Sequence, residues 1–309
     1  MKIAVLGASG HVGKTLLHEF ATNTDIELHS FVRNTSKIIS DRWLPAAAQK
    51  NVFNINLFPA AEYDAVINCI GIGNTREIQE HPLDLFMLTE KYDNLVLSYL
   101  AEHTSCVAVN ISSGAVYGTA FSSPASADKS TVFHMNNISG TDFYSMIKAY
   151  SEVKHRASPQ YKIVDVRLFS YFSAYLDLET NYFMSDLVNS IMNHQKFSTN
   201  RENFIRDFIH PSDFAQLILA AIRNGANTAV DAYSLSPISK YEILKFAENN
   251  YGVDIQYTGG FVSVTGEKSQ YFSLYRMEDN IDYSPRYTSE ETISEELKKI
   301  LERRINGKS

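Results

Sequence analysis

Cysteine is scarce in this chain: Cys69 and Cys106 are the only two among 309 residues. Each lies in an apolar run typical of a buried strand, so we expect small core residues rather than a disulfide. No histidine and cysteine cluster has the spacing of metal ligands, and no metal is expected. Free thiols in such positions suit a reducing compartment, so a cytoplasmic location is expected.

Long hydrophobic runs and dense basic runs are also missing. The first apolar run ends at Gly7 after four apolar residues, which is too short for a signal peptide or a membrane span. The formal net charge is −7, so neither nucleic acid nor an anionic membrane is expected as the main partner. An anionic small molecule is compatible with this charge if a few local cations hold it.

What the sequence does contain, over residues 1–169, is a regular alternation of short apolar runs and longer helical patterns. The apolar runs predict strands at residues 3–6, 26–32, 52–55, 65–70, 107–111 and 163–168. The longer helices are expected at about 11–20, 83–102 and 144–156. Alternating strands and helices indicate right-handed crossovers, and therefore an α/β fold with a Rossmann-type doubly wound parallel sheet.

The pattern changes after residue 169. Residues 170–205 are rich in Tyr, Phe, Asn and Ser, residues 262–275 hold strand-like stretches, and residues 289–303 are typical of a closing helix. We therefore expect a smaller C-terminal substrate-binding cap made of residues 170–205 and 225–309. Residues 206–224 are expected to return to the dinucleotide-binding domain of residues 1–169.

A glycine-rich loop follows the first predicted strand and opens a helix. Its glycines permit a tight turn and leave room for a pyrophosphate close to the backbone, where the helix N-terminus adds positive potential. In this context the loop predicts dinucleotide binding, although a tight turn without a ligand has the same composition. The residues expected to contact the dinucleotide here are Gly7, Ser9, Gly10, His11, Val12 and Gly13.

The end of the second strand bears on the choice between NAD and NADP. An acidic residue there would bind the ribose 2′-hydroxyl, but this chain has Arg33 instead. A guanidinium can pair with a 2′-phosphate, so NADP is favoured over NAD, unless Arg33 is simply a surface arginine. Asn56 and Leu57 are expected to flank the adenine, and Ile70 and Gly71 to let the backbone pass close to the cofactor.

Tyr144 and Lys148 are four residues apart and therefore share a helical face. A neighbouring ammonium stabilises a phenolate, so Tyr144 is expected to exchange a proton with a substrate hydroxyl or carbonyl near neutral pH. Lys148 can also hold the nicotinamide ribose. Ser113 follows a predicted strand, where ligands of such sheets bind, and can hydrogen-bond the same substrate oxygen.

Taken together, these motifs resemble the extended short-chain dehydrogenase/reductase family, the NAD-dependent epimerase/dehydratase group that acts on nucleotide sugars. The glycine loop, the Ser-Ser-x-x-Val-Tyr-Gly stretch at residues 112–118 and the Tyr-x-x-x-Lys pair occur in family order. Residues 206–215, Arg-Asp-Phe-Ile-His-Pro-Ser-Asp-Phe-Ala, are similar to a fourth family motif. The matching landmarks extend over residues 1–215.

The resemblance implies a catalytic triad of Ser113, Tyr144 and Lys148, and a contact between Arg206 and the diphosphate of the nucleotide sugar. A guanidinium suits phosphate oxygens, although Arg206 can also form an ion pair with a neighbouring aspartate. Arg201 and Arg276 are weaker candidates for phosphate binding. The resemblance also suggests a homodimer built on the helices that start near Leu83 and Tyr144, while burial explains the apolar sides of the first helix equally well.

One departure from the family pattern narrows the chemistry. Gly114 and Ala115 stand where family dehydratases carry Asp and Glu, and neither can transfer a proton, so 4,6-dehydration is not expected. Because Arg33 favours NADP, an NADPH-dependent 4-keto-sugar reductase is favoured, with an epimerase that holds NAD tightly as the alternative. Two further functions are compatible with the sequence. One is a dinucleotide-sensing binding protein of the same fold, and the other is an enzyme with an aromatic-lined site for a non-nucleotide ketone.

Overall fold

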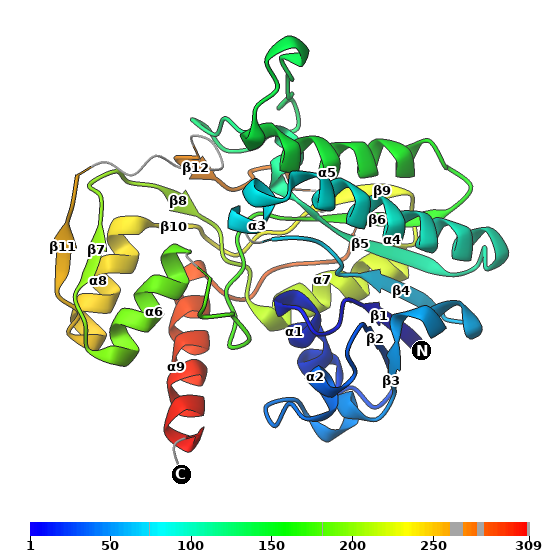
Figure 1. Ribbon diagram of the computed structural model, residues 1–309, viewed down its shortest axis with the longest axis horizontal. Coiled ribbons are helices and arrows are strands. Elements are labelled where there is room, and N and C mark those ends of the chain that lie inside the picture. Colours follow the sequence, from blue (N-terminus) through cyan, green and yellow to red (C-terminus); the bar gives the residue numbers. More distant parts are fainter. Residues whose placement is uncertain (74, 181, 260–267, 277–280, 308–309) are drawn as a thin grey trace.

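The structure is a computed structural model that describes residues 1–73, 75–180, 182–259, 268–276 and 281–307. Its central sheet is parallel throughout (Figure 1). The sheet order reverses beside the first strand, which makes a crevice at the carboxyl ends of the strands. In spatial order the strands are β3 (Val52–Asn54), β2 (Glu27–Val32), β1 (Lys2–Leu6), β4 (Ala65–Asn68), β5 (Val107–Ser113), β6 (Lys162–Leu168) and β9 (Thr228–Asp231).

Both faces of this sheet are buried, which explains the continuous apolar runs of its strands. Val5, Ile67 and Val109 face one apolar cluster, whereas Leu6 and Val66 face another on the opposite side. Figure 1 shows helices on both faces of the sheet. The first cluster is completed by α1 (His11–Phe20) and α7 (Pro211–Asn224), and the opposite face is covered by α4 (Pro82–Glu102) and α5 (Gly140–Arg156).

Short helical segments connect these elements without adding to the sheet. They are α2 (Ser36–Ile39), η1 (Ala46–Gln49), η2 (Ile55–Ala60), α3 (Thr75–Glu80), η3 (Gly114–Tyr117) and η4 (Met135–Asn137). The predicted α/β fold with a Rossmann-type doubly wound parallel sheet is confirmed. No helix in the described part of the chain is both long and apolar enough to cross a bilayer.

The remaining helices gather beside one end of the sheet around a separate apolar cluster (Figure 1). They are α6 (Phe183–Asn193), α8 (Lys240–Tyr251) and α9 (Ser289–Gly307). Two small sheets accompany them: β7 (Phe197–Thr199) with β11 (Ile255–Tyr257), and β10 (Ile238–Ser239), β8 (Ile205–Arg206) and β12 (Gln270–Tyr271).

Some details of the fold differ from the sequence analysis. Strand β9 pairs with β6 in the central sheet, although residues 225–309 were assigned to the cap. Within the strand-like stretch at 262–275, the structure has β12, while residues 262–267 lie outside the described residues. Helix α5 begins at Gly140, four residues before the predicted start, because the Asp142 carboxylate accepts a hydrogen bond from the Ser139 N–H and caps the helix.

A buried histidine joins α4, α5 and the central sheet. The Nε2 atom of His155 lies 2.6 Å from the Asp93 carboxylate, and its Nδ1 atom lies 2.9 Å from the Asp165 carboxylate. Burial alone would lower the pKa of His155, but the hydrogen bonds and charges of Asp165 and Asp93 outweigh it and raise the pKa to about 9. The imidazolium form therefore holds these elements together.

This pair of contacts predicts a pH-dependent stability. The folded pKa of His155 lies above its unfolded value of about 6.5. Its contribution to the free energy of unfolding is therefore complete below that pH and is lost as the pH rises through about 9. We expect the free energy of unfolding to fall by on the order of 1–3 kcal/mol across this range. Urea denaturation at several pH values measures it. His155→Gln should remove the dependence and exposed His134→Gln should not; an unchanged dependence in His155→Gln would contradict the assignment.

Candidate active site

The glycine loop connects β1 to α1 at the carboxyl edge of the sheet, in a conformation that few other residues permit. Gly7 has φ +74°, and a Cβ there would lie 2.9 Å from the Ile70 side chain. A Cβ at Gly13 would lie 2.5 Å from the Gly7 carbonyl oxygen. At Gly10, by contrast, the closest protein atom would be 3.4 Å away, so the space beside Gly10 is open.

No side chain caps α1, whose N-cap residue is Gly10. The first N–H groups of the helix therefore have no intrahelical partner and are available to a ligand. No acidic residue occupies the first turn, so the positive potential of the helix N-terminus is not neutralised locally. The loop thus fits the pyrophosphate of a dinucleotide, with Ser9, His11 and Val12 along its edge.

The other predicted cofactor residues lie along the same edge of the sheet. Arg33 directly follows β2 and is exposed, with no ion-pair partner among the described residues. Asn56 and exposed Leu57 lie on η2, after β3. Ile70 and Gly71 follow β4 and flank the glycine loop. Since the carboxyl ends of β1, β2 and β4 are in register, these residues lie at one edge of the sheet.

Tyr144 and Lys148 lie together on α5, facing the same edge. The Lys148 Nζ atom lies 5.8 Å from the centre of the Tyr144 ring and donates a hydrogen bond to the Ile111 carbonyl oxygen at 2.9 Å. It would lie 3.9 Å from a Cβ at Gly71, so the ammonium sits between the ends of β4 and β5. The structure therefore brings the Tyr-Lys pair next to the predicted cofactor residues.

Ser113 is the last residue of β5, and its side chain faces a tyrosine from β12. Its Oγ atom lies 3.1 Å from the hydroxyl of Tyr271 and accepts a hydrogen bond from the Ala115 N–H at 3.2 Å. The η3 turn that follows packs on α5, where Ser145 Oγ donates to the Ala115 carbonyl oxygen. These contacts hold Ser113 and the Tyr144 helix in a fixed relation.

Tyr271 also contacts Arg206, which places this arginine near Ser113. Its guanidinium carbon is 5.8 Å from the centre of the Tyr271 ring and 4.4 Å from that of Phe204. The Lys268 ammonium lies on the Tyr271 ring as well, 4.5 Å from its centre. Burial lowers the pKa of Arg206 to about 10, and burial together with the Arg206 charge lowers the pKa of Lys268 to about 8.

Two neighbouring, partly buried cations without a counter-ion are costly, and no carboxylate of the described residues lies within ion-pair distance of either. The expected alternative for Arg206, an ion pair with Asp207 or Asp213, is not formed. The Asp207 carboxylate accepts from the Ser234 N–H, and Asp213 pairs with Arg286. Arg206 donates to the Ile205 and Lys268 carbonyl oxygens. Within the described ranges, neither Arg206 nor Lys268 has a carboxylate partner, which suits the binding of an anion.

The other two predicted phosphate contacts lie elsewhere. Arg276 packs 3.8 Å from the centre of the Tyr233 ring and donates to the Ser273 carbonyl oxygen at 2.7 Å. Burial raises the pKa of Asp207, and the positive charge of Arg276 offsets part of this rise. Arg201 is exposed in the cap and lies over Tyr257. Neither Arg276 nor Arg201 shares a ring or carbonyl contact with Arg206 among the described residues, and their contact with phosphate stays a prediction.

Comparison with known proteins reveals the family. The sequence profile described as the NAD dependent epimerase/dehydratase family matches residues 3–252. The chain belongs to this family. No curated protein sequence matches at a significant level.

Solved structures of the same fold have low sequence identity. UDP-N-acetylglucosamine 4-epimerase from Methanobrevibacter ruminantium M1 is 15% identical over 99% of this chain and 98% of its own, with a TM-score of 0.81. UDP-glucose 4-epimerase from Bifidobacterium longum, solved with NAD⁺ and UDP, is 17% identical over 99% and 100%, with a TM-score of 0.78. dTDP-glucose 4,6-dehydratase from Bacillus anthracis str. Ames, solved with NAD, is 15% identical over 99% and 98%, with a TM-score of 0.79.

Within this epimerase/dehydratase site, Gly114 is sterically required. A Cβ at Gly114 would lie 2.3 Å from Cδ1 of Phe169, which packs against Tyr117 and Tyr271. An aspartate at this position would displace that ring. The packing around Ser113 therefore leaves no room for an acidic side chain at residue 114.

Neither Lys268 nor Tyr271 was among the residues predicted from the sequence. Both reach the site through the pairing of β12 with β8, in which Tyr271 lies opposite Arg206. The one sequence signal was the strand-like stretch that contains them. No group of three metal-binding side chains occurs in the described ranges.

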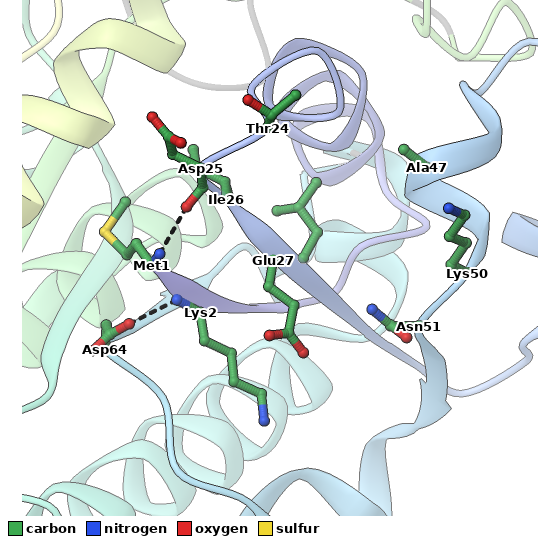
Figure 2. A pocket seen from close by; sticks show the side chains of 11 residues that line it. Met1, Lys2, Thr24, Asp25, Ile26, Glu27, Ala47, Lys50, Asn51 and Asp64 are labelled. Atoms are coloured by element: carbon green, nitrogen blue, oxygen red, sulfur yellow. Dashed lines mark hydrogen bonds between the residues drawn. The ribbon is translucent and has the colours of Figure 1, made fainter.

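A separate hollow of about 570 Å³ lies at the opposite edge of the sheet, where β1 and β2 begin (Figure 2). Figure 2 shows Lys2, Glu27, Lys50 and Asp64 on its rim, so charges of both signs are mixed there. It lies across the sheet from Tyr144 and has no part in the active site.

Proposed function

We propose that this protein is an NAD(P)-dependent oxidoreductase that acts on a nucleotide-activated sugar, by hydride transfer at a keto or hydroxyl carbon. The observation that carries the proposal is the convergence of three features at one sheet edge. These are the open glycine loop, the Tyr144–Lys148 pair beside Gly71, and the cations Arg206 and Lys268, which have no carboxylate partner in the part of the chain that the structure describes.

In this proposal each side chain has a distinct task. A bound nicotinamide supplies or accepts the hydride. Tyr144 gives or takes the matching proton at the sugar oxygen, and Lys148 stabilises the phenolate and holds the nicotinamide ribose. Ser113 hydrogen-bonds the same sugar oxygen and stabilises the charge that develops on it.

Two reactions are compatible with this site. The exposed Arg33 after β2 favours NADP, and thus a 4-keto-sugar reductase that consumes NADPH. The similar solved structures include epimerases, among them one solved with NAD⁺, which supports an epimerase that keeps its cofactor.

Product analysis separates the two. The chain is incubated with NADPH and 4-keto nucleotide sugars, and separately with NAD⁺ and UDP-glucose, UDP-N-acetylglucosamine or UDP-glucuronic acid. Stoichiometric loss of NADPH identifies a reductase, and interconversion of isomers without net loss identifies an epimerase. Absence of both reactions, together with no binding of UDP or dTDP, contradicts the proposed function.

The cation pair gives a prediction for nucleotide binding. Charge-assisted hydrogen bonds contribute about 1.5–3 kcal/mol each, so Arg206→Met and Lys268→Met should each raise the Kd for UDP or dTDP about tenfold or more. Because the Lys268 ammonium loses its proton through about pH 8, affinity should also fall above that pH in the wild type. Isothermal titration calorimetry measures both effects. Arg201→Met is the matched control and should bind UDP or dTDP with the wild-type Kd. Wild-type Kd values in both Arg206→Met and Lys268→Met would contradict a diphosphate clamp formed by Arg206 and Lys268.

We also propose a homodimer formed through α4 and α5. Leu83 and Met87 on α4, and Tyr150 and Val153 on α5, are large apolar side chains exposed to solvent. Light scattering on the purified chain measures its mass in solution, and a monomeric mass would contradict the dimer.

A further inference from the structure

Tyr271 is a second tyrosine at the proposed active site, and no motif pointed to it. Its side chain is only 6% exposed, and its hydroxyl lies 3.1 Å from Ser113 Oγ. Burial, and to a lesser extent the nearby Tyr144, raises the pKa of Tyr271 well above its ordinary value. The phenol therefore keeps its proton throughout the physiological range, and this buried O–H needs an acceptor.

The direction of the hydrogen bond follows from counting donors and acceptors. Among the residues the structure describes, Ser113 Oγ is the acceptor that lies within reach of the Tyr271 hydroxyl. The 3.1 Å contact permits either hydroxyl to donate. We take Tyr271 as the donor and Ser113 as the acceptor, because the phenolic proton would otherwise be buried without a partner among the described residues. Ser113 Oγ also accepts from the Ala115 N–H, so both of its lone pairs are used.

A serine whose lone pairs are both used can offer only its own proton. We propose that Tyr271 is a positioning residue that makes Ser113 a dedicated hydrogen-bond donor to the reacting sugar oxygen. This inference rests on the proposed function. A fixed donor suits an oxygen that gains negative charge when its carbon is reduced, because the donor is oriented before the charge develops.

Tyr271 is itself held firmly. It pairs with Arg206 across β12 and β8, and its ring touches Phe121 and Phe169. Two residues further on, Ser273 Oγ donates to the buried Asp231 carboxylate at 2.5 Å. The same ring lies against the Arg206 and Lys268 cations, so one side chain contacts both the proposed diphosphate clamp and the reacting end of the site.

A double-mutant cycle of Tyr271→Phe and Ser113→Ala tests the inference in two ways. For activity, Tyr271→Phe should lower kcat about 3- to 10-fold, the value of one hydrogen bond, with KM unchanged. In the Ser113→Ala background it should have no further effect. Because phenylalanine keeps the ring, the Kd for UDP should stay within about twofold.

The second readout is thermal unfolding, which needs no substrate. Ser113→Ala leaves the Tyr271 hydroxyl buried without its acceptor and should lower Tm. Adding Tyr271→Phe removes that hydroxyl and should raise Tm again relative to Ser113→Ala. Additive effects on Tm or on kcat overturn the inference, as does a large loss of UDP affinity in Tyr271→Phe. A wild-type chain that binds neither UDP nor dTDP overturns the proposed function and this role with it, whereas additive effects in a chain that binds UDP overturn this role alone.

Discussion

Tyr144→Phe is expected to lower kcat by roughly 10²- to 10⁴-fold, the range in which a positioned proton donor contributes. The substitution removes one oxygen atom and keeps the ring that packs near Ile72 and Ile147. Tyr144 is partly exposed and no hydrogen bond of its hydroxyl holds the described structure together, so folding should be unaffected. The loss should therefore fall on turnover and not on stability.

Binding measurements separate this outcome from a structural one. Tyr144→Phe should bind NAD or NADP, and UDP or dTDP, with wild-type Kd values in calorimetry. Tyr150→Phe, on the exposed face of the same helix, is the matched control and should retain full kcat. Wild-type turnover in Tyr144→Phe would show that the catalytic assignment is wrong and would favour a dinucleotide-binding protein without this chemistry.

The parts of the fold that were predictable depend on residues close together in the sequence. A strand such as β6 is an apolar run covered on both faces, and the glycine loop is contiguous with the strand and the helix that it joins. The Tyr144–Lys148 pair is likewise set by helical periodicity. Strand β9 is only four residues long, Thr-Ala-Val-Asp, and this short run did not stand out from the segment assigned to the cap.

The parts that were missed depend on contacts between distant segments. Lys268 reaches Arg206 only because β12 pairs with β8, and nothing near residue 268 indicates that pairing. Charge alone made Arg276 a phosphate candidate, and the structure adds that its guanidinium contacts Tyr233 and the Ser273 carbonyl oxygen, so its phosphate contact stays a prediction. Tertiary packing decides which cations lie beside one another, and only the pairing of β12 with β8 reveals that Lys268 and Arg206 both contact the Tyr271 ring.

Two glycines of the same loop should respond to alanine in opposite ways. At Gly13 the new Cβ would lie 2.5 Å from the Gly7 carbonyl oxygen and 2.7 Å from the Ala8 Cα atom. Both are backbone atoms that cannot move aside, so Gly13→Ala should destabilise the protein by about 1–3 kcal/mol or more. At Gly10 the backbone is extended, with φ −78° and ψ 171°, and the nearest protein atom would be 3.4 Å away. Gly10→Ala should therefore fold normally.

Gly10→Ala should weaken dinucleotide binding without lowering the stability of the fold. A methyl group there occupies the space into which the helix N–H groups point, so the pyrophosphate cannot approach the backbone. We expect the Kd for NAD or NADP to rise about tenfold or more, equivalent to about 1.4 kcal/mol, with the urea midpoint unchanged. Gly140→Ala, at a helix start with no atom within 4 Å of its Cβ position, is the control for both measurements. If Gly10→Ala bound the dinucleotide as tightly as the wild type, the open space beside Gly10 would not be the pyrophosphate site, because a ligand held by those amides has no room for that methyl group.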